Sequence, residues 1–137
     1  MQLASAFAGI AIEHSMLGAA HAAANALSAR YGLAHGLAVG LTVVEVVRWN
    51  AADPIARGLY EELSRAAGLG ATAAALVDAL EALRTVCAIP HVSACGLVAE
   101  DIEELAHVAM QQWTAGFNPR PIGWEDFVGL FEGMMAK

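Results

Sequence analysis

Alanine-rich runs that glycine and proline interrupt at short intervals are the feature that most limits how this chain folds. Hydrophobic residues make up 58% of the sequence, and much of this apolar content is alanine, which has the highest helix propensity. Clusters of the β-branched and aromatic residues typical of strands are scarce, and the best is LTVVEVV at 41–47. The sequence therefore predicts an all-α fold, and 137 residues suffice for one domain with a substantial core.

Glycine and proline divide the chain into six or seven expected helices joined by short loops, which is typical of a helical bundle. The expected helices cover residues 2–30 with a possible break at 15–18, and residues 37–49, 54–68, 71–88, 100–113 and 124–135. The segment 37–49 is predicted to be almost wholly buried, with a strand as the less favoured alternative. YGLAHG at 31–36 is expected to be a loop, and NAADP at 50–54 indicates a helix end followed by a helix with proline in its first turn. No repeat or internal boundary divides residues 1–137, so we expect a single domain.

The charge pattern argues against two classes of partner. The formal net charge is -7 and the seven basic residues are scattered, whereas nucleic acids and anionic membranes are bound through clustered Lys and Arg. The apolar stretch 3–12 is followed at once by Glu13 and His14, and polar groups are costly at the centre of a bilayer. No basic region precedes this stretch as in a leader peptide. We therefore expect neither nucleic acid nor a membrane as a partner.

The chain has few cysteines and few charged residues. Cys87 and Cys95 are too few for a disulfide scaffold, which favours a reducing cytoplasm as the location. Charged residues are only 15% of the sequence, so few charged side chains are available to cover a solvent-exposed surface. We therefore expect an apolar face that lies against another protein layer.

Two histidines in the alanine-rich segment are the main candidates for chemistry. On one continuous helix His14, Gly18, His21 and Asn25 share a face, and Gly18 leaves room above His21. If the chain reverses at residues 30–36, the imidazole of His35 can converge on that of His21. Imidazole is the commonest transition-metal ligand, but a stable divalent site needs three or four protein ligands, and no Asp or Cys lies nearby in the sequence. Spacing thus leaves two readings open, half of a metal site or a pair of hydrogen-bonded histidines at helix ends.

A family resemblance favours the first of these readings, half of a metal site. The segment 18–36 resembles the pattern G-x-x-H-x-x-x-[HN]-x-L-x-x-x-x-G-x-x-H-G of the C-terminal helical domain of the iron-containing (group III) alcohol dehydrogenases. The matching residues are Gly18, His21, Asn25, Leu27, Gly32, His35 and Gly36. VVRWN at 46–50 and NPRPIGWEDFVGLFE at 118–132 are similar to further parts of that domain. The resemblance implies an all-helical bundle of the dehydroquinate synthase-like kind over residues 1–137.

The resemblance also implies a metal site shared between two parts of a larger enzyme. In that family a nucleotide-binding α/β domain holds NAD or NADP, and one Asp and three His hold the metal. His21 and His35 match the last two ligands, while the first Asp and His belong to a preceding segment, which this chain is expected to lack together with the nucleotide-binding domain. Asn25 stands near substrate at a position that is often histidine, and an amide cannot relay a proton as imidazole does. Where many relatives have Pro-His, this chain has Val44-Glu45, a change expected to straighten the helix and to affect packing more than chemistry.

The function implied is the metal half of an NAD(P)-linked alcohol dehydrogenase that interconverts alcohols and aldehydes or ketones. The metal is expected to be Fe(II), with Zn(II) or Ni(II) as alternatives, and NAD(P) binds only with the missing domain. We expect the isolated chain to be inactive. One alternative is a self-standing helical module that binds a copy of itself or a partner through its apolar face. Another is one subunit of a split dehydrogenase whose nucleotide domain is a second polypeptide.

The remaining candidates are given structural roles. His14 is expected to be a core or interface residue, and His91 and His107 to be surface or loop residues. The two cysteines are expected to be buried thiols. The expected core anchors are Trp49, Trp113 and Trp124. Asn118, Pro119 and Arg120 are expected to fix a loop, and Glu125 and Asp126 to lie favourably at the start of the last helix.

Overall fold

The protein is a bundle of seven α-helices with three short 3-10 helices and, over the described residues 2–136 of the computed structural model, no strand. The α-helices are α1 (Gln2–Ser15), α2 (Ala19–Tyr31), α3 (His35–Asn50), α4 (Pro54–Ala66), α5 (Ala73–Val86), α6 (Ile102–Met110) and α7 (Trp124–Met135). The 3-10 helices are η1 (Val92–Cys95), η2 (Ala99–Asp101) and η3 (Trp113–Phe117). The prediction of an all-α bundle is confirmed, and the segment left open between helix and strand is a helix.

Most helix ends follow from local sequence. Asp53 accepts hydrogen bonds from the amides of Ile55 and Ala56 and so caps α4, which begins at Pro54 as NAADP predicts. α2 ends at Gly32, whose φ of 66° is the left-handed conformation that glycine adopts without strain. The predicted loop 31–36 is wrong at both ends, because the connection is only residues 32–34 and α3 already begins at His35. A glycine near a helix start costs no more than about 1 kcal/mol, and the buried face of α3 outweighs that cost.

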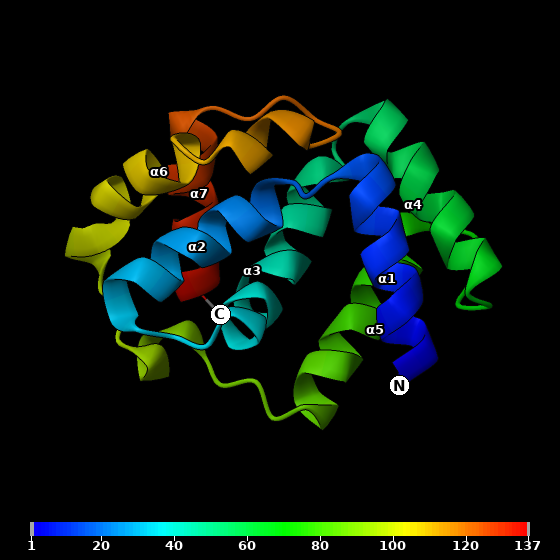
Figure 1. Ribbon diagram of the computed structural model, residues 1–137, viewed down its shortest axis with the longest axis horizontal. Helices are drawn as coiled ribbons and strands as arrows, with labels where there is room; N and C mark the ends of the chain where they lie inside the picture. Colours follow the sequence, from blue (N-terminus) through cyan, green and yellow to red (C-terminus); the bar gives the residue numbers. More distant parts are fainter. Residues whose placement is uncertain (1, 137) are drawn as a thin grey trace.

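The main core forms where α2 packs against α3 and α6, with α7 closing the far side (Figure 1). The buried residues of α2 are mostly alanines, whose small side chains let neighbouring helices approach closely. Phe127 and Phe131 of α7 are fully buried in the same cluster. The alanine content noted in the sequence is therefore the packing surface of the central helix.

α3 lies between two cores. Its other side packs on the α4–α5 pair through a smaller cluster that contains Val44, Val47, Leu76 and Val77. Because α3 is covered by both groups of helices, its sequence lacks a polar stripe and resembles a strand.

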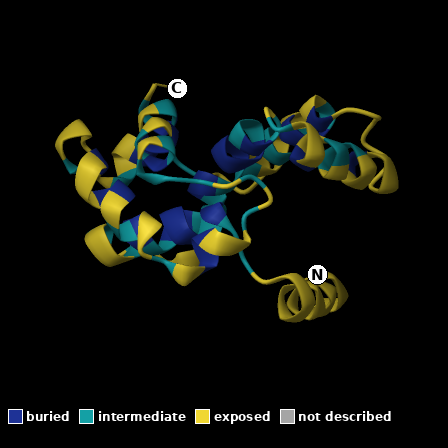
Figure 2. Cartoon of the chain, turned by 90° about the horizontal axis from the view of Figure 1, so that it is seen from above, coloured by how far each residue is buried: buried dark blue, intermediate teal, exposed yellow. Residues whose placement is uncertain are grey.

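α1 stands apart from the rest of the bundle, and Figure 2 shows it exposed on all sides. Met16 has a φ of 61°, and the axes of α1 and α2 differ by 106° across this break. The expectation that His14 shares a helix face with His21 is therefore wrong, because the two residues lie on different helices. No single helix in residues 2–136 has the length and apolar content needed to cross a membrane. α1 and α2 meet that test only as a bent pair, by length and composition.

Candidate functional site

His21 and His35 meet where α2 and α3 begin. His21 lies in the first turn of α2 and His35 is the first residue of α3. After Gly32 the connection runs back beside α2, and α3 then rises toward the start of α2, so the two helices pack against each other (Figure 1). The two ring centroids are 5.2 Å apart, with an angle of 45° between the ring planes. The structure thus brings together the two imidazoles that the sequence singles out.

The spacing of the rings suits a shared metal ion. A metal–nitrogen bond of 2.0–2.1 Å and a tetrahedral angle place two ligating imidazole centroids about 5 Å apart. Burial of His21, and secondarily the nearby His35, lowers the pKa of His21 below its usual value. A lowered pKa favours the neutral imidazole, which is the form that binds metals.

The site is incomplete as a metal centre. Within residues 2–136 no group of three or more His, Cys, Asp or Glu side chains is placed to hold one ion. His14 is exposed on α1, His91 lies in the loop before η1, and His107 is exposed on α6 beside Trp124. The donor set therefore fits two of the three or four positions that a stable divalent site needs.

Asn25 lies one helical turn beyond His21 on α2 and is partly buried. Its Nδ2 donates a hydrogen bond of 3.1 Å to Oε1 of Gln112, which follows α6. Gln112 was not singled out from the sequence, since nothing local marks a residue that meets α2 across 87 positions. The role of Asn25 in a substrate pocket stays a prediction.

A polar cluster next to the histidine site joins the last residue of α3 to the loop before α7. Asn50 is buried, exchanges hydrogen bonds with Asn118 and donates one to the hydroxyl of Tyr60. Arg120 donates to the carbonyl oxygen of Trp49 at 2.6 Å and stacks on the Trp49 ring at 3.6 Å. The prediction that Asn118 and Arg120 fix a loop is confirmed. The sequence did not predict their partners on α3, although VVRWN contains Trp49 and Asn50 and NPRPIG contains Asn118 and Arg120.

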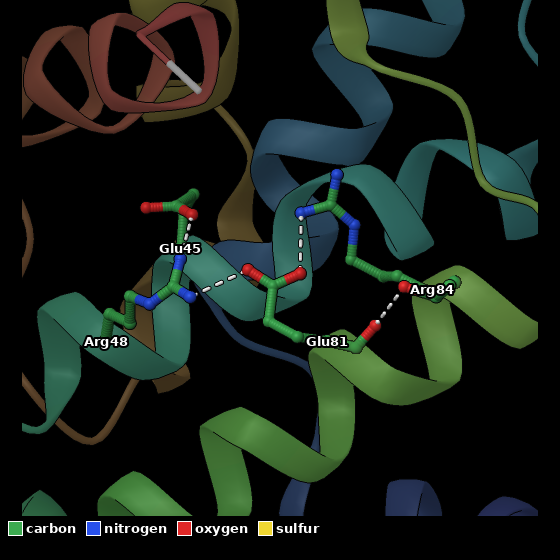
Figure 3. A network of polar contacts seen from close by, with 5 residues as sticks. Glu45, Arg48, Glu81 and Arg84 are labelled. Atoms are coloured by element: carbon green, nitrogen blue, oxygen red, sulfur yellow. Dashed lines mark hydrogen bonds and ion pairs between the residues drawn. The ribbon is translucent and has the colours of Figure 1, made fainter.

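Glu45 takes part in an ion-pair network between α3 and α5. Arg48 contacts Glu45 at 2.6 Å and Glu81 at 2.7 Å, while Arg84 lies 3.5 Å from Glu81 (Figure 3). Glu45 is buried at 9% exposure. The network connects two helices, which agrees with the expectation that the departure at Val44-Glu45 concerns packing.

Two further structural predictions were wrong. Cys87 is exposed and Cys95 is partly buried, because Cys87 follows the end of α5 where the chain leaves the core. Trp113 is 65% exposed and packs edge-on against Phe117 at the surface, whereas Trp49 and Trp124 do pack partly buried against the main core. Glu125 and Asp126 lie in the first turn of α7 as expected, and Asp126 accepts from the amide of Gly123 at 2.8 Å.

Known proteins of one family match this chain over nearly its whole length. Residues 1–135 match the C-terminal part of the Fe-containing alcohol dehydrogenase family. The 1-propanol dehydrogenase PduQ of Salmonella typhimurium is 31% identical over 98% of this chain and 40% of its own length. Lactaldehyde reductase of Escherichia coli is 32% identical over 96% of this chain and 36% of its own length.

Solved structures agree with these relatives. The alcohol dehydrogenase from Oenococcus oeni superposes with a TM-score of 0.79 at 32% identity, covering 93% of this chain and 35% of that one. The crystal structure of a 1,3-propanediol oxidoreductase also gives a TM-score of 0.79, at 25% identity, over 87% of this chain and 33% of that one. The chain spans less than half the length of each of these proteins. Together with the helical fold and the paired histidines, the matches show that this chain belongs to the Fe-containing alcohol dehydrogenase family and corresponds to the C-terminal domain of its members.

Proposed function

We propose that this chain is the metal-binding half of a metal-dependent alcohol dehydrogenase, in which His21 and His35 supply two ligands. The observation that carries the proposal is the 5.2 Å separation of their rings, which suits a shared ion, within the C-terminal fold of this family. The remaining ligands come from a polypeptide segment outside residues 1–137. Fe(II) is the metal that the family name favours, and Zn(II) is the alternative.

A bound divalent metal supplies a Lewis acid that stabilises negative charge developing on the substrate oxygen. His21 and His35 hold the ion in place, and burial keeps His21 in the neutral form that metal binding requires. Asn25 borders the substrate on the same face of α2, where its amide orients the substrate but relays no proton. The nucleotide-binding domain would hold the nicotinamide that supplies the hydride chemistry. By name, PduQ and lactaldehyde reductase act on three-carbon compounds, so we propose a short-chain alcohol as the substrate.

The uncovered apolar surface supports a partner for this half. Exposed apolar side chains gather on α1 and α4, at Leu3, Phe7, Ile10, Ile55, Leu59 and Leu63. Apolar patches of this kind mark surfaces that another protein layer covers. The nucleotide-binding part of the enzyme, in the same polypeptide or in a second one as in a split enzyme, is the partner that completes the metal site.

A metal titration of the purified chain tests the proposal. We compare Zn(II) and anaerobic Fe(II) binding by the native chain with His21→Ala and His35→Ala, and use His14→Ala as the matched control. Removal of one of two direct ligands lowers affinity by roughly 10-fold or more, since even outer-sphere partners of metal ligands are worth 10–100-fold. The control, which alters an exposed histidine outside the pair, binds like the native chain. Equal binding by all four proteins, or steady NAD-linked alcohol turnover by the native chain alone, contradicts the proposal.

A second function, a self-associating helical module without catalysis, is favoured by one specific observation. α1 contributes no buried residue to the bundle although its sequence is strongly apolar. Such a helix is suited to dock on a second copy of the chain.

A further inference from the structure

The start of α2 is capped by a residue from the far end of the chain. The first amides of a helix lack partners within the helix and need an acceptor. Gly18 precedes α2 and has no side chain to provide one. The amide of Ala19 donates instead to Oδ1 of Asn118, at 3.2 Å and 99 residues away.

Gly18 makes this contact possible. A Cβ atom at position 18 would lie 3.0 Å from Oδ1 and 3.5 Å from Cα of Asn118. The second distance is an ordinary contact, but the first is so tight that Oδ1 of Asn118 would have to shift by a few tenths of an ångström. The space that the sequence predicted above His21 therefore holds Asn118.

The orientation of Asn118 is fixed by its own amide nitrogen. Its Nδ2 donates to Oδ1 of Asn50 and to the carbonyl oxygen of Arg120, both at 2.7 Å. Because Nδ2 points to two acceptors, Oδ1 is left to face the amide of Ala19. Asn50 is 1% exposed and in turn donates to the hydroxyl of Tyr60 at 2.7 Å. Asn118 thus connects the first residue of α2 with the last residue of α3.

This connection bears on the histidine pair through the two helices. The amide of His21 bonds to the carbonyl oxygen of Gly18 at 3.1 Å, so His21 belongs to the turn that Asn118 caps. His35 begins the same helix that Asn50 ends. Thr42 of α3 adds a second contact to this turn by donating to the carbonyl oxygen of Ala20 at 2.9 Å. If the first turn of α2 frays, His21 moves relative to α3 and therefore relative to His35.

We infer that Asn118 is a positioning residue for the two-histidine site, holding His21 beside His35 by capping α2 and anchoring that cap on Asn50. The metal-binding part of this inference rests on the proposed function. The geometric part, which concerns the first turn of α2 and the distance between the two rings, stands without a metal.

The test compares Asn118→Ala with a matched loss elsewhere. Asp53→Ala removes the side-chain cap of α4 in the same way, on a helix that carries no histidine. Three readouts are measured on the full chain: Zn(II) affinity, amide hydrogen exchange at residues 19–22, and the nuclear Overhauser contact between the rings of His21 and His35. The urea midpoint shows how far each variant is destabilised overall.

Asn118→Ala is expected to lower Zn(II) affinity about 10-fold, the lower end of the range for partners that orient metal ligands. It also speeds exchange at residues 19–22 and weakens the ring-to-ring contact. Asp53→Ala is expected to leave Zn(II) affinity, exchange at residues 19–22 and the ring-to-ring contact within about twofold of the native chain. This holds even if its urea midpoint falls as much as that of Asn118→Ala, because mutations at distant sites act independently. Asn118→Asp keeps an acceptor for Ala19 but removes the Nδ2 donor to Asn50 and Arg120, so it is expected to lose the anchor of the cap and to speed exchange as Asn118→Ala does.

Gly18→Ala provides a second approach should Asn118→Ala fold poorly. It pushes Asn118 away from the helix while the bond to Asn50 stays available, and the φ of -125° at this position allows alanine. It is expected to change the same three readouts in the same direction as Asn118→Ala.

The outcomes separate the inference from the proposed function. An unchanged ring-to-ring contact and unchanged exchange in Asn118→Ala overturn the inference, even if the native chain binds Zn(II). Equal losses in Asp53→Ala overturn it too, because the effect is then general destabilisation. A native chain that binds no Zn(II) contradicts the proposed function. Amide exchange at residues 19–22 and the ring-to-ring contact need no metal and still test the inference.

Discussion

At the scale of single residues, Asp101 gives the clearest link between contacts and pH. Its carboxylate accepts hydrogen bonds from Arg30 at 2.8 Å and from the hydroxyl of Tyr31 at 2.7 Å, and so ties the end of α2 to η2. The bonds to Arg30 and then Tyr31 lower the pKa of Asp101 below its usual 3.8. A lowered carboxyl pKa stabilises the folded state above pH 3.8, and this contribution is lost as the pH falls through the folded value.

We predict that Asp101→Asn unfolds at lower urea than the native chain at pH 6, and that the difference shrinks as the pH falls below about 3.8. The pKa of Tyr31 is raised by burial, by its bond to Asp101 and by the charge of Asp101, so the variant also shifts Tyr31 back toward its ordinary value of 10. Tyr60 serves as the internal control, because its pKa is raised by burial and Asp101 does not contribute to that shift. Urea unfolding between pH 3 and 6 and absorbance titration of tyrosinate measure the two effects. A difference in urea midpoint that is independent of pH would contradict this account.

At the scale of helices, the contact between α3 and α5 depends on Arg48 more than on Arg84. Arg48 joins Glu45 and Glu81 at 2.6 and 2.7 Å, and Glu45 is buried, whereas the Arg84–Glu81 pair is 3.5 Å long. The difference lies in Glu45, whose side chain is 11% exposed, whereas that of Glu81 is 36% exposed. Removing the cation beside the more buried carboxylate costs more. We predict a loss of about 1–3 kcal/mol for Arg48→Met and under about 1 kcal/mol for Arg84→Met, measured by urea unfolding. Equal losses would show that the burial of Glu45 does not matter.

Helices were predictable from the sequence where the signals are local. The break near residues 15–18, the start of α4 at Pro54 and, to within one residue, the end of α2 before Gly32 follow from residues beside the break itself. The direction of α1 did not follow, because a left-handed φ at Met16 is not expected of a non-glycine residue. The start of α3 was misplaced because Gly36 was read as part of the loop, whereas it lies inside the first turn of the helix.

Only the part of the candidate site that lies within one short segment was predictable from residue spacing. His21 and His35 were identified from one segment and lie together. Gln112 beside Asn25, and Asn118 at the amide of Ala19, come from segments 87 and 99 residues away, so no local pattern pairs them with α2. The family resemblance covered those segments but did not reveal which side chains meet. Contacts between distant segments are set by tertiary packing, and for that reason the cap on α2 emerged only from the structure.

At the scale of the whole molecule, the apolar side chains of α1 have no place in the bundle. Leu3, Phe7 and Ile10 are 67%, 62% and 55% exposed, and their spacing puts them on one stripe of α1. Burying a side chain of this size gains about 1.5–3 kcal/mol, so three of them provide a substantial driving force for association. We predict that the mass of the isolated chain in sedimentation equilibrium rises with protein concentration.

Replacing these three residues by serine is expected to leave a monomer whose free energy of unfolding changes by less than about 0.5 kcal/mol, because substitutions at exposed positions rarely affect folding. The matched control is the triple serine variant at Ile55, Leu59 and Leu63, which are 75%, 53% and 53% exposed on α4. If association runs through α1 alone, the control associates like the native chain, and if both helices form one surface, either variant abolishes association. A native chain that stays monomeric at high concentration would contradict self-association and leave the nucleotide-binding part of the enzyme as the partner that covers α1.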